Sequence, residues 1–298
     1  FHILIIGDSM KNYEKTVLKV SIITLIGNIV LSVFKILIGV LCGSNAIISD
    51  GIHSASDVLS TVVVMIGVRL SSKESDKEHP YGHERFECVA AIILSVMLFL
   101  TASIIGYSAI KNLFTTNNEI HFGMFAIIIA IISIVTKEAM YWYTKINADR
   151  INSNALLADA WHHRSDAFSS IGSLIGVIGF YYGYYILDCI AGIIICFCIC
   201  KVAFDIFNDA INKMIDHACS EEFENELITL IKKQEGILGI DDFKTRMFGN
   251  KIYVDIEIKV AGDDSLQHAH LIAHKTHDAI ENIYPIVKHC NIHVNPGK

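Results

Sequence analysis

The chain carries SDGIHSASD at residues 49–57 and ADAWHHRSD at residues 158–166, two polar stretches inside apolar sequence. Both stretches read D-x-x-H-x-x-x-D. On an α-helix, positions i, i+3 and i+7 lie on one stripe, so each stretch presents Asp, His and Asp from one face. Two such faces brought together offer imidazoles and carboxylates to one metal ion. We interpret the rest of the chain as the structure that holds this site.

The predicted ligands are His53 and Asp57 from the first stretch and His162 and Asp166 from the second. A lone His on an apolar face is more often a core residue than a ligand, but here a His–Asp pair recurs with the same spacing. Two nitrogen and two oxygen donors form a four-coordinate set suited to Zn²⁺, and Co²⁺, Fe²⁺, Mn²⁺ and Cd²⁺ can use the same atoms.

Five other polar residues lie in or beside these stretches. Asp50 and Asp159 stand one helical turn from the histidines and are predicted to support the site, to cap helices or to line its entrance. Lys35, in the preceding apolar segment, is a candidate counter-ion for Asp50. The alternative is a lysine whose ammonium extends to the membrane surface. His163 and Arg164 are assigned to packing or to the neighbouring loop.

Composition indicates a membrane protein. Of the 298 residues, 52% are hydrophobic and only 18% are charged, and the mean hydropathy is +0.46; these values are too apolar for an ordinary soluble enzyme. The net charge is −7, so no basic face is available and nucleic acid is excluded as a partner.

Six apolar stretches have about the 20 residues that a membrane-spanning helix needs. They are Val17–Cys42, Ala46–Leu70, Cys88–Leu113, Phe122–Tyr143, Ala155–Tyr181 and Tyr185–Ile206. Lysine and arginine gather at one side of these stretches, while the links at residues 43–45, 114–121 and 182–184 carry almost no charge. The positive-inside rule then predicts a multi-pass protein of the cell membrane with both termini in the cytoplasm.

A second domain is predicted to follow the spans. Residues 1–213 form the predicted transmembrane domain and residues 214–298 a polar domain with the order αββαβ. Its predicted elements are a helix at Ser220–Gln234, strands at Ile237–Phe248 and Lys251–Val260, a helix at Asp264–Ile283 and a strand at Ile286–Val294.

Two further groups of metal-ligand residue types lie outside the spans. Asp76, His79 and His83 surround a predicted turn at Pro80 and Gly82; loop histidines are also often simply solvated. In the polar domain, the candidate ligands at strand ends or on the last helix are Asp241, Glu257, His270 and His293.

Together these features resemble the cation diffusion facilitators, membrane transporters that move divalent transition metals out of the cytosol in exchange for protons. The resemblance runs from about Lys19 to Pro296 and includes the six spans, both His–Asp pairs, the His-Pro-Tyr-Gly-His loop and the αββαβ tail, in family order. It implies a ferredoxin-like or metallochaperone-like tail domain that forms a homodimer. It also implies Zn²⁺ as substrate and as a candidate structural or regulatory ion, no organic cofactor, and protons and the lipid bilayer as partners.

Position by position, the resemblance implies that the two His–Asp pairs form the transport site and that the loop site lies between membrane and tail. Arg85 and Asp216 occupy the places of a charge pair that links the two subunits in similar transporters. The tail departs from the pattern: Asp241 and Glu257 replace histidines of zinc-binding relatives, and Asn295 stands where an Asp often occurs.

The resulting prediction is a Zn²⁺/H⁺ antiporter that works by alternating access as a homodimer. One alternative is the same transporter with Mn²⁺, Fe²⁺, Cd²⁺ or Co²⁺ as its main substrate. Another class is a membrane metal sensor, which binds metal without transporting it. A membrane metalloenzyme would need an additional general base in the membrane, and Glu138 is the glutamate available there.

Overall fold

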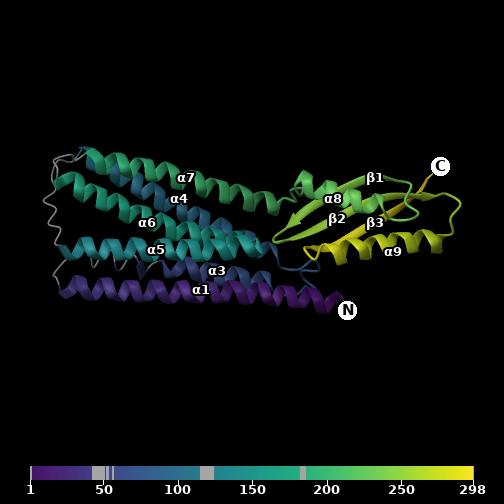
Figure 1. The fold of residues 1–298 in the computed structure, drawn as a ribbon, viewed down its shortest axis with the longest axis horizontal. Coiled ribbons are helices and arrows are strands. Elements are labelled where there is room, and N and C mark those ends of the chain that lie inside the picture. The colour runs from purple at the N-terminus through teal and green to yellow at the C-terminus, as the bar shows by residue number, and fades with distance from the viewer. Residues whose placement is uncertain are drawn as a thin grey trace. The chain divides into compact units, whose positions relative to one another are not determined.

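The structure is a computed structural model, and it describes residues 2–41, 51, 54–55, 57–114, 124–181 and 186–297 (Figure 1). Asp50 and His53 therefore lie outside the described residues. The elements, in chain order, are α1 (His2–Leu41), α3 (Val58–Ser71), α4 (Arg85–Phe114), α5 (Met124–Ile151), α6 (Asn154–Tyr181), α7 (Ile186–Met214), α8 (Glu221–Lys232), β1 (Gly239–Phe248), β2 (Lys251–Ala261), α9 (Leu266–Ile283) and β3 (Val287–Gly297).

The chain divides into two compact units. The helical unit contains Lys11–Glu74 and Phe86–Ala210, and the α/β unit contains Ile211–Lys298 together with Phe1–Met10 and Ser75–Arg85. The loop segment Ser75–Arg85 thus belongs to the α/β unit although it lies between helices in sequence.

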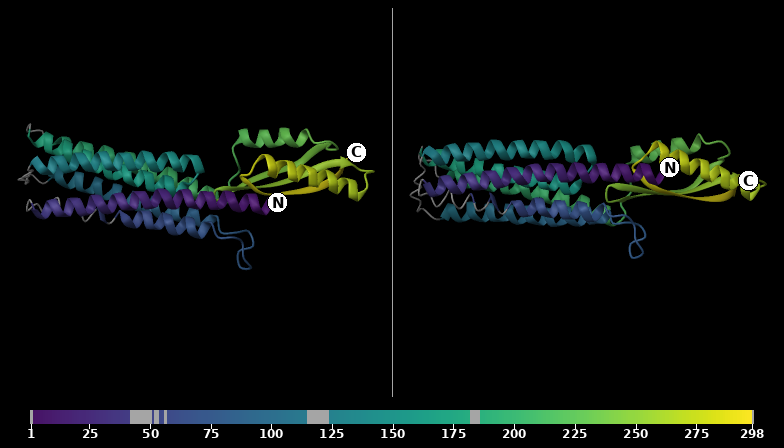
Figure 2. Two further views of the ribbon diagram at one scale, coloured as in Figure 1. Left: turned by 60° about the horizontal axis from the view of Figure 1, so that its bottom comes forward. Right: turned by 90° about the horizontal axis from the view of Figure 1, so that it is seen from below.

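The helical unit is a bundle in which long helices run side by side (Figures 1 and 2). Helix α6 packs against both α5 and α3. The outward side chains of the bundle are apolar: Phe197 is 73% exposed, Ile104 68% and Val135 63%. The interior of the bundle contains buried polar and charged groups. A bundle that is apolar outside and polar inside is typical of a membrane protein with a polar pathway.

In the described part of the chain, three helices are long and apolar enough to cross a membrane: Tyr13–Ile38, Arg85–Lys111 and Ile127–Ile151. They correspond to the first, third and fourth predicted spans. The described part of the second span forms the shorter apolar helix α3. The fifth and sixth spans coincide with helices α6 and α7, which have 28 and 29 residues; that they cross the membrane remains a prediction.

The α/β unit has the predicted αββαβ order. Its sheet has the strand order β1-β2-β3; β1 and β2 are antiparallel, and β2 and β3 are parallel. The right-hand view of Figure 2 shows α8 and α9 on the same face of this sheet. Alternate apolar residues of β2 pack beneath them: Ile252, Val254, Ile256, Ile258 and Val260.

Local sequence explains where these elements begin and turn. The Ser220 hydroxyl accepts a hydrogen bond from the Phe223 amide at 3.4 Å and caps α8, whose first turn is acidic. The turn between β1 and β2 uses Gly249 at φ +62°, a conformation that favours glycine. A Cβ at Gly249 would lie 2.5 Å from the Glu84 carbonyl oxygen, so the Ser75–Arg85 segment also requires a glycine there.

Candidate functional site

Three of the four predicted transport-site residues converge inside the helical unit. Asp57 immediately precedes α3, while His162 and Asp166 lie one turn apart on α6. Ligand-type atoms of all three lie within 4.8 Å of one another, and His162 Nε2 is 3.7 Å from Asp57 Oδ1. Each residue is 6% exposed or less. Two carboxylates and an imidazole in this arrangement are a candidate divalent-cation site.

Sequence reasoning missed a fourth charged residue at this site. Lys137 of α5 is 1% exposed, and its ammonium donates to Asp57 Oδ2 at 2.6 Å and Asp166 Oδ2 at 2.9 Å. It also donates to the Asn28 side-chain oxygen at 3.0 Å. The available signal was a lysine in the middle of an apolar helix, where a charge usually marks a pathway or an ion partner.

Asp159 lies outside the three-residue group but close to it in the fold. It is fully buried and accepts hydrogen bonds from the Ser60 and Thr61 hydroxyls of α3, at 3.3 and 3.5 Å. His163 Nε2 lies 3.6 Å from the other Asp159 oxygen. Asp159 therefore joins α3 to α6 beside the candidate site, and its supporting role stays a prediction.

The structure also describes the other polar residues of these segments. Lys35 is 1% exposed and donates to the Ser54 hydroxyl at 3.0 Å, so it does not extend to the surface; its proposed partner Asp50 lies outside the described residues. The Arg164 guanidinium lies 4.2 Å from the Tyr141 ring centroid and 3.4 Å from a Glu138 oxygen. Arg164 thus packs against α5, which favours packing over the neighbouring loop as its role.

The loop residues form a second convergent group, in the α/β unit. Ligand-type atoms of Asp76, His79 and His83 lie within 4.8 Å of one another. His79 Nδ1 is 3.3 Å from one Asp76 oxygen and His83 Nε2 is 3.5 Å from the other. The turn requires Gly82, at φ +99°. This group is a candidate metal site with one buried and two accessible residues.

Contacts with the sheet hold this loop in place. The Tyr81 carbonyl accepts hydrogen bonds from the Tyr253 hydroxyl at 3.1 Å and from Lys288 Nζ at 2.9 Å. Lys288 also pairs with the buried Glu84 carboxylate. Burial and the nearby Glu84 charge raise the pKa of Tyr253 to about 12, which keeps its hydroxyl protonated as a donor.

Two of the four predicted tail ligands, Glu257 and His293, are directly opposite each other in the register of β2 and β3, and the predicted tail metal site stays a prediction. The Asn295 amide donates to both Asp241 and Glu257, at 3.1 Å each. Asp241 also pairs with Lys259, whose ammonium lowers the pKa of this carboxyl. Both carboxylates thus accept a hydrogen bond from Asn295, and Asp241 also has a cationic partner in Lys259. Helix α9 and strand β3 place the two histidines of the set, His270 and His293, at exposed positions.

Arg85 and Asp216 pair with each other within one chain. The Arg85 guanidinium also lies 4.7 Å from the centroid of the Phe248 ring. Asp216 has φ +61°, in the left-handed region that few residues other than glycine and asparagine adopt readily. The predicted role of this pair between subunits stays a prediction.

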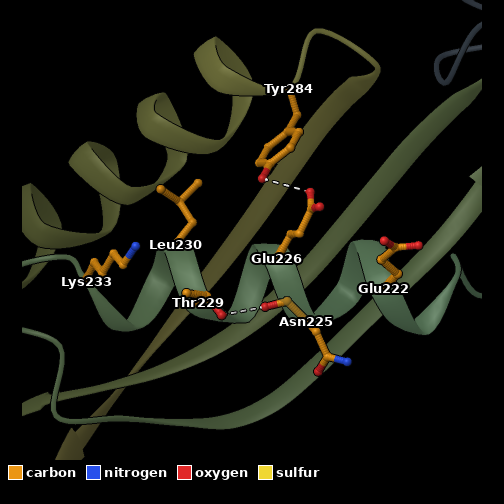
Figure 3. Close-up of a pocket in the computed structure, with 7 residues that line it drawn as sticks. All are labelled: Glu222, Asn225, Glu226, Thr229, Leu230, Lys233 and Tyr284. Carbon is orange, nitrogen blue, oxygen red and sulfur yellow. Dashed lines mark hydrogen bonds between the residues drawn. The ribbon is translucent and has the colours of Figure 1, made fainter.

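A hollow on α8 is a separate surface feature (Figure 3). Its lining residues are Glu222, Asn225, Glu226, Thr229, Leu230, Lys233 and Tyr284. The Tyr284 hydroxyl donates to Glu226 at 3.4 Å across it. This lining contains no histidine or cysteine, so the hollow is not a candidate transition-metal site.

Comparisons with known proteins match both units. Residues 21–215 match the family model described as the cation efflux transmembrane domain. Residues 219–297 match the model described as the cytoplasmic domain of cation efflux proteins.

Individual relatives agree with these matches. An uncharacterized transporter of Methanocaldococcus jannaschii is 37% identical and covers 96% of this chain and 99% of its own. Metal tolerance protein C1 of Arabidopsis thaliana is 34% identical over 92% of this chain and 61% of its own. The manganese efflux system protein MneS of Bacillus subtilis is 31% identical over 97% of both chains. A solved C-terminal domain of MamM in a cadmium form covers 26% of this chain at 18% identity, with a TM-score of 0.26.

Proposed function

Because the chain belongs to the cation diffusion facilitator family, we propose that it moves Zn²⁺ out of the cytosol in exchange for protons. Family membership makes the protein a membrane transporter of divalent metal cations and not an enzyme. The choice of Zn²⁺ and the coupling to protons are the proposed part.

The observation that carries the proposal is the buried convergence of Asp57, His162 and Asp166. Mixed imidazole and carboxylate donors suit Zn²⁺. We propose His53 as the fourth ligand, because the D-x-x-H-x-x-x-D repeat places it one helical turn before Asp57 as His162 is placed before Asp166.

Proton exchange follows from the chemistry of such ligands. Imidazoles and carboxylates must lose protons to bind a metal ion, and histidine titrates near physiological pH. We propose that the metal binds from the cytosol, that the helices rearrange to open the site to the other side, and that protons then displace the metal. In this scheme the protein is a multi-pass homodimer with both termini in the cytoplasm, and its cytoplasmic domain forms the dimer contact.

Manganese is the second candidate substrate, and a specific observation favours it. The relative MneS is a manganese efflux protein. The Asn28 side-chain oxygen accepts a hydrogen bond from the Lys137 ammonium, as do the Asp57 and Asp166 carboxylates. Asn28 therefore adds an oxygen atom beside the candidate site. Oxygen donors suit Mn²⁺ better than Zn²⁺.

Transport by the purified full chain in lipid vesicles tests the proposal. An imposed pH gradient is expected to drive Zn²⁺ uptake by the wild type and not by Asp57→Ala. Asp149→Ala is the matched control, because Asp149 lies at the exposed end of α5 and pairs with Lys145. If the rate of Zn²⁺ uptake does not depend on the pH gradient, the proposed exchange for protons is wrong. If Mn²⁺ is taken up in preference to Zn²⁺, the main substrate is Mn²⁺.

A further inference from the structure

Lys137 places a positive charge where a cation transporter binds its substrate. Its ammonium has three N–H donors, and all three are used: on Asp57 at 2.6 Å, on Asp166 at 2.9 Å and on Asn28 at 3.0 Å. The side chain is fully enclosed by protein. A lysine that merely completed the packing of a membrane helix would not need to lie between two carboxylates of the candidate site.

The same geometry leaves one oxygen of each carboxylate for another partner. Asp57 Oδ1 faces His162 Nε2 at 3.7 Å, and within the described part of the chain Asp166 Oδ1 has no hydrogen-bond partner. The ammonium thus holds the Oδ2 atoms, while the Oδ1 atoms and the imidazole remain on the side where a metal ion would bind. A metal ion and the Lys137 ammonium therefore use the same two carboxylates.

We infer that Lys137 is a resident cation of the transport site, which competes with the metal ion for Asp57 and Asp166 and thereby determines how tightly the metal is held. This inference rests on the proposed function, since it assigns the transport role to the Asp57/His162/Asp166 group. It makes Lys137 an affinity-determining residue and not a ligand, because a charged ammonium offers no lone pair to a metal ion.

Competition follows whether or not the ammonium moves. If it stays on the Oδ2 atoms, it repels a divalent ion a few ångströms away inside a medium of low dielectric constant. If it leaves, the metal ion must replace three hydrogen bonds that satisfy a buried charge. Either way, metal binding is weakened, and release of the metal on the other side of the membrane becomes faster.

Weaker binding of the metal ion favours turnover in a transporter. Ligands strong enough to strip water from a transition-metal ion also hold it for a long time, and transport requires binding that still permits release. A cation that is covalently attached to the site provides the opposing force without leaving the protein. After release, it also neutralises part of the charge of the two buried carboxylates, which would otherwise repel each other.

Kinetics in vesicles of the full chain test this inference, with Zn²⁺ as the probe. Lys137→Met and Lys137→Gln remove the charge, and we expect the KM for Zn²⁺ and the kcat to fall together, the KM by ~10-fold or more. Lys137→Arg keeps the charge and is expected to stay near the wild-type KM. Lys145→Met is the control, because it is the same substitution on α5 at an accessible position paired with Asp149.

Thermal unfolding gives a second measurement that a purely structural role would not produce. Without the ammonium, the metal-free protein retains two uncompensated carboxylates, so Zn²⁺ should raise the unfolding temperature of Lys137→Gln more than that of the wild type. A neutral variant whose KM rises or stays unchanged, or whose stabilisation by Zn²⁺ is no larger, would overturn the inference. A wild type that transports no divalent ion would instead overturn the proposed function.

Discussion

At the scale of single residues, Asp159 is a buried carboxylate that lies beside the candidate metal site and links its helices. It accepts hydrogen bonds from Ser60 and Thr61 on α3 while belonging to α6. Asp159 lies one helical turn before His162, and Ser60 lies one turn after Asp57. The hydrogen bonds of Asp159 therefore hold the segments that carry the candidate ligands next to each other. Such outer partners typically change metal affinity or activity by about 10- to 100-fold when removed.

We therefore predict that Asp159→Ala lowers Zn²⁺ transport by about 10- to 100-fold but leaves the number of bound metal ions per chain unchanged. Asp166→Ala, in contrast, should remove the transport-site ion itself. Metal content by mass spectrometry after equilibrium dialysis, with transport measured on the same preparations, separates the two effects. Loss of one ion per chain in Asp159→Ala would make this residue a ligand.

Single residues also show where sequence reasoning succeeds and where it ends. The repeated spacing predicted that Asp57, His162 and Asp166 converge, as they do in the structure, because helical periodicity fixes which side chains share a face. The spacing could not identify Lys137, because its place depends on how α5 packs against α6, and no periodicity within one helix encodes a neighbour's rotation. The partners of the tail carboxylates were unpredictable for a similar reason: Asn295 and Lys259 contact Asp241 and Glu257 from neighbouring strands.

At the scale of elements, Thr245 connects β1 to α8. Its hydroxyl donates to Glu224 at 2.6 Å and accepts a hydrogen bond from the Cys219 amide at 2.9 Å. The residue is 7% exposed, so water does not replace these bonds readily. Thr276 on α9 is also buried, but its hydroxyl only donates to the Ile272 carbonyl of its own helix, which already accepts a helical bond.

We predict that Thr245→Val lowers the free energy of unfolding of the α/β unit by about 1–3 kcal/mol, because it removes two partly buried hydrogen bonds that each contribute about 0.5–1.5 kcal/mol. The matched variant Thr276→Val should cost less than about 0.5 kcal/mol. Alkylation of Cys290 during a urea titration measures both, since this thiol is 1% exposed and burial raises its pKa to about 12. An equal loss of unfolding free energy in the two variants would show that the Thr245 hydroxyl does not stabilise the contact between β1 and α8.

Element boundaries show a comparable division between local and tertiary causes. The pattern of apolar residues predicted the order αββαβ, and the ends of its elements differ by only a few residues from the structure. The assignment of Ser75–Arg85 to the α/β unit was not predictable in this way. It depends on Tyr253 and Lys288, which lie far away in sequence and donate to the same Tyr81 carbonyl.

At the scale of the whole molecule, the ion pair of Arg85 and Asp216 can form in two ways in a dimer: within one chain or between the two subunits. In this structure the pair forms within one chain, whereas the family resemblance predicted it between subunits. Both side chains are more than a third exposed, so an ion pair here contributes less than about 1 kcal/mol. The stacking of Arg85 on Phe248 adds about 0.5–1 kcal/mol.

We accordingly predict that Arg85→Gln destabilises the α/β unit more than Asp216→Asn, and that the double variant gives a coupling energy below about 1 kcal/mol. Asparagine is the chosen replacement because it tolerates the left-handed backbone at Asp216, φ +61°, and so removes only the charge. The Cys290 alkylation assay measures the unfolding free energies of the wild type, both single variants and the double variant at two protein concentrations about 100-fold apart. A pair within one chain gives the same coupling energy at both concentrations. If the coupling energy rises with concentration, the pair belongs to the subunit interface and each chain completes the contact of its partner.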